Sequence, residues 1–376
     1  MIDSETVTLD VLKANVARDL LAEKVGIVSR ALSTRASVLV LGGIHLRSAE
    51  GMLELAATDM EVSLRATVEA EIGGAGEVVV PGKLLLDITR SLPDGSVSLE
   101  YLPEESILLI TSGTASYRIH TYSAEDFPHL PEIAEESLQP ADRETLLGTI
   151  ARVSRSASRD ESRPVLTGIF VSFEGQKLVM AATDSYRLAV KETPAPSPLP
   201  ELQAIIPARA LQELTRIAGS ADSIDLAVQE NHVVFGAEGV WLTSRRIDGQ
   251  FPNYKQLLPE QFEHELELPR EELLDVVRRV GLLAQRNSPL RLRFAEGELT
   301  VSARTQDVGE AREALPAPYA ADAMEIGFNA DFLRDGLESI DTETVRVKLI
   351  SPLRPAVLQG DSPDYTYLIM PIRLAG

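Results

Sequence analysis

Cysteine is absent from the sequence. A disulfide, a thiolate metal site and a cysteine nucleophile are therefore excluded, and a reducing cytoplasm is the expected compartment. No apolar run approaches the ~20 residues that a membrane-spanning helix needs. The N-terminus also lacks the basic and then apolar pattern of a signal peptide. We expect a soluble cytoplasmic protein with no membrane partner.

Positive charge is scarce, since 36 Lys and Arg stand against 57 Asp and Glu and give a net charge of −21. Such a chain does not adhere broadly to nucleic acid or to anionic lipid, so a nucleic-acid role requires a local basic surface. The histidines show no metal-binding spacing such as His-Glu-X-X-His. Gly73–Gly76 precedes strand-like residues, which favours a hairpin turn over a phosphate loop. We expect no catalytic residue, metal or cofactor.

A repeat is present in place of these features. Ala-Ala-Thr-Asp stands at 56–59 and again at 181–184, so the two aspartates lie 125 positions apart. Pro81 and Pro207 keep nearly the same step, as do the two Phe-Pro pairs at 127–128 and 251–252. A fixed period predicts repeated structural units. We therefore divide the chain into three domains, residues 1–131, 132–259 and 260–376, the third inferred mostly from its order of elements.

Each unit reads as helix, strands, helix, strands, which predicts an α+β fold. Apolar residues at helical spacing predict helices over 17–32, 83–92, 142–159, 207–218, 269–282 and 329–340. Runs rich in branched residues predict strands at 12–16, 38–41, 44–46, 52–55, 62–66, 168–190, 224–247, 290–303, 344–349 and 365–374. The proline-containing joints at 127–131 and 251–259 are short, so we expect the domains to pack side by side.

Four motifs carry a resemblance to a known family. They are Ala-Thr-Asp-Ser-Tyr-Arg-Leu-Ala-Val at 182–190, Gly-Gln-Phe-Pro-Asn-Tyr at 249–254, Glu-Ile-Gly-Phe-Asn at 325–329 and Tyr-Leu-Ile-Met-Pro-Ile-Arg-Leu at 367–374. In this order they resemble the bacterial DNA polymerase III β subunits, the sliding clamps. The residues of the motifs are most similar to those of actinobacterial members.

The resemblance implies three similar domains per chain, of the DNA clamp fold, and a homodimer closed head to tail into a ring around double-stranded DNA. Such a ring is not an enzyme. It is a processivity factor that tethers the replicative polymerase to DNA topologically, and an acidic exterior is compatible with this role if the hole is basic.

The resemblance also implies a partner pocket between the second and third domains. There the polymerase, the clamp loader and repair proteins insert short linear motifs with apolar anchors. Carried over by position, the pocket consists of Arg163, Leu166, Thr183, Ser185, Leu188, Pro252, Leu257, Val357, Met370, Pro371, Ile372 and Arg373. Ser185 stands where many relatives have Gly, and Gln256 where an Arg is often found, so either residue can alter the peptide preference.

Arginines at the ends of two predicted helices are candidates for the lining of the hole. Arg152, Arg155 and Arg159 follow early acids and are spaced to share one helix face. The simpler alternative is that acids near the N-terminus of a helix and bases near its C-terminus only complement the helix macrodipole. With the resemblance, we favour a DNA-facing role for these three and for Arg35, Lys83, Arg90, Arg209, Arg216, Arg279 and Arg286.

Two other functions remain open from the sequence. Asp59 and Asp184 could form an aspartic-protease-like pair that shares a proton. That class uses Asp-Thr/Ser-Gly, whereas Met-Glu and Ser-Tyr follow the two aspartates here, so we favour aspartates that cap local backbone N–H groups. A repeat scaffold that binds only proteins is the second alternative.

Overall fold

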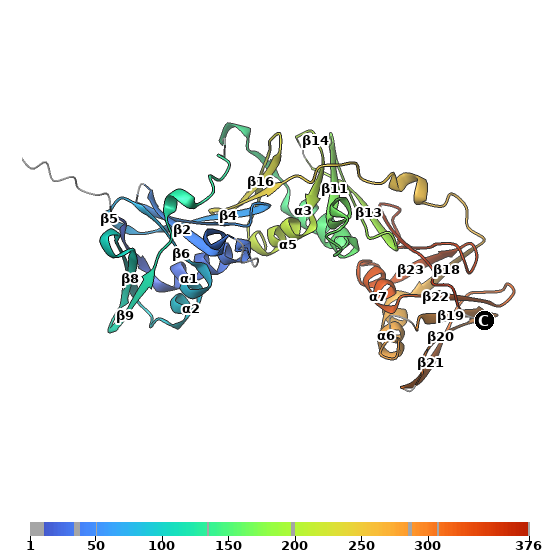
Figure 1. The fold of residues 1–376 in the computed structure, drawn as a ribbon. Coiled ribbons are helices and arrows are strands. Elements are labelled where there is room, and N and C mark those ends of the chain that lie inside the picture. The colour runs from blue at the N-terminus through green and yellow to red at the C-terminus, as the bar shows by residue number, and fades with distance from the viewer. Residues whose placement is uncertain are drawn as a thin grey trace, which may run out of the picture. The chain divides into compact units, whose positions relative to one another are not determined.

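The computed structural model describes residues 11–33, 38–49, 51–133, 135–196, 200–284, 288–306 and 308–374. Its internal contacts divide the chain into two compact units. Unit 1 contains residues 1–141 and 213–245, and unit 2 contains residues 142–212 and 246–376. Figure 1 shows that both units are built from antiparallel sheets covered by helices, so the α+β fold is confirmed.

Unit 1 has two sheets. The smaller has the order β5 (Glu71–Gly74), β1 (Lys13–Ala17), β7 (Ser96–Leu102), β8 (Ile107–Ser112) and β9 (Ala115–His120). The larger has the order β10 (Gln139–Ala141), β15 (Ile224–Val228), β16 (His232–Ala237), β17 (Val240–Arg245), β4 (Val62–Glu69), β3 (Met52–Thr58), β2 (Gly43–Ala49) and β6 (Glu77–Pro81). Helices α1 (Arg18–Val28) and α2 (Gly82–Ser91) pack against each other, and α1 buries Leu21, Val25 and Val28.

Unit 2 also has two sheets. The larger has the order β14 (Leu202–Pro207), β11 (Gly168–Glu174), β12 (Lys177–Thr183), β13 (Arg187–Pro194), β25 (Tyr365–Ile369), β24 (Ala356–Gln359), β23 (Thr344–Leu349) and β18 (His264–Pro269). The smaller has the order β21 (Gly309–Pro316), β20 (Glu298–Thr305), β19 (Leu290–Ala295) and β22 (Met324–Phe328). Its helices are α3 (Arg143–Val153), the short α4 (Pro164–Thr167), α6 (Arg270–Gly281) and α7 (Ala330–Glu338), while α5 (Ala208–Ile217) runs across the division between the units.

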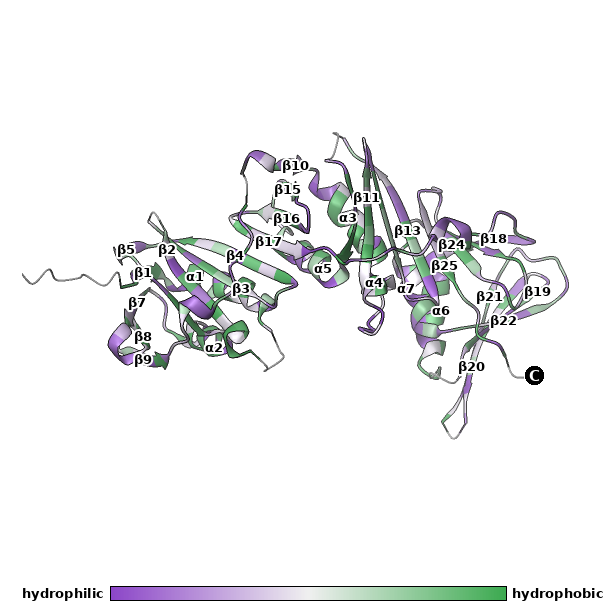
Figure 2. Cartoon of the chain, turned by 45° about the horizontal axis from the view of Figure 1, so that its top comes forward, coloured by the Kyte–Doolittle hydropathy of each residue, from purple (hydrophilic) through white to green (hydrophobic). Residues whose placement is uncertain are grey.

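Each large sheet joins strands from two of the expected domains. In unit 1, β4 pairs antiparallel with β17, from Val62 opposite Ser244 to Ala66 opposite Val240. In unit 2, β13 pairs in the same way with β25, from Arg187 opposite Ile369 to Lys191 opposite Tyr365. An edge strand presents unpaired N–H and C=O groups, so this pairing satisfies edges that would otherwise be exposed. The inner strands of these sheets are mostly hydrophobic, as the green segments of β3, β4 and β11 show in Figure 2.

Several sequence-based boundaries need correction. Residues 38–41 were predicted as a strand, but Val38 precedes and the other three residues begin a 3₁₀ turn, η2 (Leu39–Gly42), because the sheet register with β6 begins only at Gly43. The helix predicted over 142–159 ends as an α-helix at Val153 and continues as the 3₁₀ turn η6 (Ser154–Ser156), before Ala157 turns extended. The last strand ends at Ile369, short of residue 374.

The glycines at 73–76 do not form a hairpin turn. Gly73 and Gly74 end β5, which pairs with β1, whereas β6 pairs with β2 in the other sheet. Glycine is required there by close packing, since a Cβ on Gly74 would lie 2.3 Å from the carbonyl oxygen of Val11. The segment is therefore a connection between two sheets.

Candidate partner-binding site

The candidate site is built on the turn between β12 and β13. The Asp184 carboxylate accepts the N–H groups of Tyr186 at 2.9 Å and Arg187 at 3.0 Å. The Thr183 hydroxyl donates to the Arg187 carbonyl at 2.6 Å and accepts the Ser185 N–H at 3.1 Å. These bonds hold Ser185 at a φ of 79°, in the left-handed region.

Unit 1 contains the same turn between β3 and β4. Asp59 accepts the N–H groups of Glu61 at 3.1 Å and Val62 at 2.9 Å, and Thr58 accepts the N–H of Met60. Met60 has a φ of 77°, close to that of Ser185. Each aspartate thus caps its own turn, as the sequence predicts, and the repeated Thr-Asp is a structural device in both copies.

Arg187 fastens the turn to two helical elements. Its guanidinium donates to Asp184 at 3.0 Å, to Asp335 on α7 at 2.6 Å and to the carbonyl of Arg155 at 2.5 Å, and it lies 4.3 Å above the Phe332 ring. Burial opposes its charge, but attraction to Tyr367 and the bond to Asp335 outweigh burial and raise the pKa of the Arg187 guanidinium above its usual value. The sequence analysis missed this role, because nothing local marks one buried arginine.

An apolar cluster lies beside the turn. Leu188, Val357 and Leu368 are buried in it at neighbouring positions of β13, β24 and β25. The aromatic residues Phe251 and Tyr254 complete the cluster, and Phe251 stacks on Phe170 with ring centroids 5.5 Å apart. The 3₁₀ turn η7 (Tyr254–Leu257) ends at Leu257, a predicted pocket residue that is 50% exposed. Leu258, the next residue, packs on this cluster instead. The sequence analysis also missed Phe251, Tyr254 and Leu258.

The C-terminal residues reach two places. Met370 donates its N–H to the Tyr186 carbonyl at 2.8 Å, which places it beside the turn, and its side chain is 40% exposed. Ile372 instead donates its N–H to Gly327 of β22 at 2.7 Å, next to the smaller sheet. For Pro252, Pro371 and Arg373, membership of a pocket stays a prediction.

Arg163 stands at the rim of this site. Its Nη1 donates to the Ser185 hydroxyl at 3.0 Å, and its Nε donates to Asp160 at 3.1 Å. Leu166, a predicted pocket residue, donates its N–H to the Arg163 carbonyl from the short helix α4. The structure therefore brings Arg163, Thr183, Ser185, Leu188, Val357 and Met370 around one turn, with Leu166 in the short helix α4 that follows Arg163.

The predicted DNA-facing residues fall into two groups. Lys83 and Arg90 lie exposed seven positions apart on α2, and Arg209 and Arg216 do so on α5, so each pair shares one helix face. Arg216 pairs with Glu213, a buried carboxylate that also lies 3.6 Å from Arg30. Arg35 and Arg286 lie outside the described residues.

In the second group, Arg152, Arg155 and Arg279 are paired with acids, as Arg216 is in the first group. Arg155 pairs with Glu338 on α7, Arg152 with Asp341, and Arg279 with Glu313 on β21 at 2.8 Å. Only Arg152 lies on α3. Arg155 falls in η6 and Arg159 in the loop beyond, so the expectation that all three share a helix face is wrong, because the α-helix ends at Val153.

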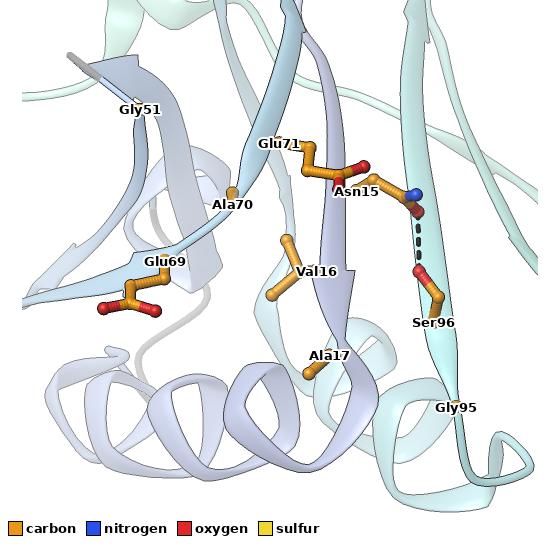
Figure 3. A pocket seen from close by; sticks show the side chains of 9 residues that line it. All are labelled: Asn15, Val16, Ala17, Gly51, Glu69, Ala70, Glu71, Gly95 and Ser96. Atoms are coloured by element: carbon orange, nitrogen blue, oxygen red, sulfur yellow. Dashed lines mark hydrogen bonds between the residues drawn. The ribbon is translucent and has the colours of Figure 1, made fainter.

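Unit 1 also has an open groove, of about 560 Å³, that the sequence analysis did not single out. Figure 3 shows Asn15 bonded to Ser96, with the carboxylate of Glu71 beside Asn15 and that of Glu69 on the far side of Val16. The lining residues are Asn15, Val16, Ala17, Gly51, Glu69, Ala70, Glu71, Gly95 and Ser96. Among the residues that the structure describes, no cluster of His, Cys, Asp or Glu is arranged to hold a metal ion, and no helix is long and apolar enough to cross a membrane.

Comparison with known proteins covers nearly the whole chain. Residues 12–131, 141–253 and 255–373 match, in turn, the family models of the N-terminal, central and C-terminal domains of the DNA polymerase III beta subunit. The beta sliding clamp of Streptomyces coelicolor is 35% identical over 97% of this chain and 100% of its own length.

Solved structures give the same picture. The sliding clamp of C. crescentus aligns with a TM-score of 0.90 and 28% identity over 97% of this chain and 99% of that one. The Pseudomonas aeruginosa clamp bound to griselimycin aligns with a TM-score of 0.87 and 29% identity, over 97% of this chain and 100% of that one. The chain therefore belongs to the bacterial DNA polymerase III β subunits, the β sliding clamps, a family of processivity factors without a catalytic site.

Proposed function

We propose that two copies of this chain close head to tail into a ring around duplex DNA and tether the replicative polymerase, the clamp loader and repair proteins through the site beside β13. The observation that carries the proposal is the assembly of Ser185, Leu188, Val357 and Met370 around one turn fixed by Arg187. An apolar cluster with a few oriented polar groups at its edge suits a short peptide with apolar anchors.

The full peptide site that we propose is the set Arg163, Leu166, Thr183, Ser185, Leu188, Pro252, Leu257, Val357, Met370, Pro371, Ile372 and Arg373. Met370 supplies a flexible apolar side chain that can adapt to different anchors.

We further propose the domain division 1–131, 132–259 and 260–376, which the repeated motifs and the three consecutive family matches support. Because the partners act on chromosomal DNA, we propose the cytoplasm as the location.

For DNA, we propose that the basic faces of α2 and α5 line the hole, with Arg35, Lys83, Arg90, Arg209 and Arg216. Arg152, Arg155, Arg159, Arg279 and Arg286 complete the set, but the acids beside Arg152, Arg155 and Arg279 weaken the attraction to phosphate. A partly neutralised lining favours sliding, since retention then depends on ring closure and not on tight phosphate contacts.

The test is retention on DNA of different topology. Clamp loaded on nicked circular DNA should persist at a salt concentration that removes ordinary phosphate binders, which lose roughly 10³–10⁵ in affinity between about 50 and 200 mM. Linearising the DNA should release it. Light scattering should give twice the 40.9 kDa chain mass. Equal loss from circular and linear DNA would contradict the ring and favour a scaffold that binds only proteins.

A further inference from the structure

The side chain of Ser185 has a role that its turn does not require. A left-handed backbone conformation is strained for a residue with a Cβ, and such strain concentrates at functional sites. The matching turn in unit 1 reaches the same conformation with Met60, at a φ of 77° against 79° for Ser185. The turn therefore accepts different side chains, and the hydroxyl of Ser185 has a separate effect, which is to accept the hydrogen bond from Arg163.

Asp160 holds the other side of the same guanidinium. Its Oδ2 accepts the bond from Arg163 Nε at 3.1 Å, while its Oδ1 accepts the N–H of Ser162 at 3.1 Å and the Ser162 hydroxyl at 2.6 Å. The two bonds from Ser162, and then those from Arg163, keep the pKa of the Asp160 carboxyl below its usual value. Arg163 is thus fixed between an anion and a neutral hydroxyl.

One edge of the Arg163 guanidinium remains available. Its side chain is 42% exposed, and among the described residues no acceptor is bonded to Nη2. Guanidinium nitrogens only donate, so the group that meets this edge must be an oxygen acceptor. Tyr186, the next residue along the turn, is 62% exposed, so the rim is open to a ligand.

We propose that Ser185 and Asp160 set the charge preference of the peptide site, by presenting Arg163 as an oriented donor whose charge is already compensated. Such a donor favours a neutral carbonyl oxygen, of a side-chain amide or a peptide bond, over a carboxylate. A carboxylate attracted to Arg163 would also be repelled by Asp160, so its net attraction to this exposed pair is small. This inference rests on the proposed peptide site and names a preference within it.

The experiment uses the full-length chain and short synthetic peptides with a Leu-Phe anchor. Each position before the anchor carries Gln, Glu or Ala in turn, so the position that meets Arg163 is found without assuming a register. Fluorescence anisotropy at physiological salt gives the affinities. At one position the Gln peptide should bind the wild type about fivefold more tightly than the Glu peptide, the size of one net hydrogen bond.

Three variants identify the cause. Asp160→Asn should shift the Glu-to-Gln affinity ratio toward Glu by about tenfold, because the repelling charge is gone. Ser185→Ala should reduce Gln binding about threefold and leave the Ala peptide unchanged, since Arg163 is no longer oriented. Met60→Ala is the matched control for Ser185→Ala, because it truncates the side chain at the equivalent left-handed position of the unit 1 turn and keeps the Cβ. It should leave every peptide affinity unchanged.

The outcomes separate the two proposals. Peptide binding to the wild type with Glu-to-Gln ratios that are unchanged in Asp160→Asn and Ser185→Ala would overturn this inference alone. Absence of binding by every peptide, with the wild type still dimeric, would overturn the peptide site and this inference together.

Discussion

Removal of the Arg187 guanidinium should destabilise unit 2 selectively. The side chains of its partners Asp184 and Asp335 are only 12% and 18% exposed, and Arg187 itself is 9% exposed. The substitution Arg187→Met keeps the length and packing of the side chain but leaves the shielded Asp184 without its cation and Asp335 with only Arg155, 3.7 Å away. Breaking a buried ion pair in this way costs about 3–5 kcal/mol, which corresponds to a fall of roughly 10 °C in the melting temperature of a unit of this size.

The chain has an internal control for this experiment. Its only tryptophan, Trp241, lies on β17 of unit 1, so tryptophan fluorescence reports unit 1, while circular dichroism reports both units. Arg187→Met should lower the transition seen by circular dichroism and leave the fluorescence transition nearly unchanged. As a matched variant, Arg278→Met removes an arginine paired with Glu338 at 2.9 Å but 50% exposed. It should leave both transitions nearly unchanged, because an exposed ion pair contributes little to stability.

Two results would refute this reasoning. A loss for Arg187→Met no larger than that for Arg278→Met would mean that the carboxylates are solvated despite their low exposure. Equal shifts of both spectroscopic transitions would mean that Arg187 stabilises the chain as a whole and does not act locally on the turn at 183–187.

Three further predictions concern the peptide, DNA and acid. Met370→Ala should weaken binding of polymerase-derived peptides by about 1–2 kcal/mol with the dimer preserved, and unchanged calorimetric titrations would place the peptide elsewhere. Glu338→Gln should release Arg155 and Arg278 from the acid that they share and steepen the salt dependence of DNA binding by about one unit of log–log slope. A slope equal to that of the wild type counts against a DNA role for both arginines. Burial lowers the pKa of His45 by more than Glu77 raises it. The unfolded chain therefore binds a proton at this histidine more readily than the folded chain does, and the free energy of unfolding falls as the pH decreases below about 6.5. His45→Phe should remove that loss, measured as melting temperatures at about pH 7.5 and 5.5, and an equal acid loss in both proteins would exclude His45 as its source.

The His45 variant has a precedent within the chain. His45 stacks on Phe127 with centroids 5.0 Å apart, and 125 positions later Phe170 stacks on Phe251 at 5.5 Å, both pairs at an interplanar angle of 29°. The repeat therefore extends to aromatic packing, although the sequence analysis used only the Thr-Asp, Pro and Phe-Pro landmarks.

Local pattern determined most of the elements. Helices and strands depend on periodicity and on residues that are neighbours in sequence, so α2 and α5 fall within one residue of the predicted bounds and β3 begins where the sequence predicts it. Boundaries were less well determined, because the pairing partner decides where a strand begins or ends. Residues 38–41 have strand-like composition, yet the register of β2 with β6 excludes them from the sheet.

The sequence by itself also determined the repeat, the family and the capping role of Asp59 and Asp184, since these depend on motifs and on bonds within a few residues. Only the tertiary structure decided that Arg187 meets Asp335, 148 positions away, and that Leu258 and not Leu257 packs on the apolar cluster. It also decided that acids neutralise the charges of Arg152 and Arg155. The sequence pattern alone predicted these arginines as a basic surface. Contacts between distant positions depend on how whole sheets and helices pack, and no spacing along one chain encodes that packing.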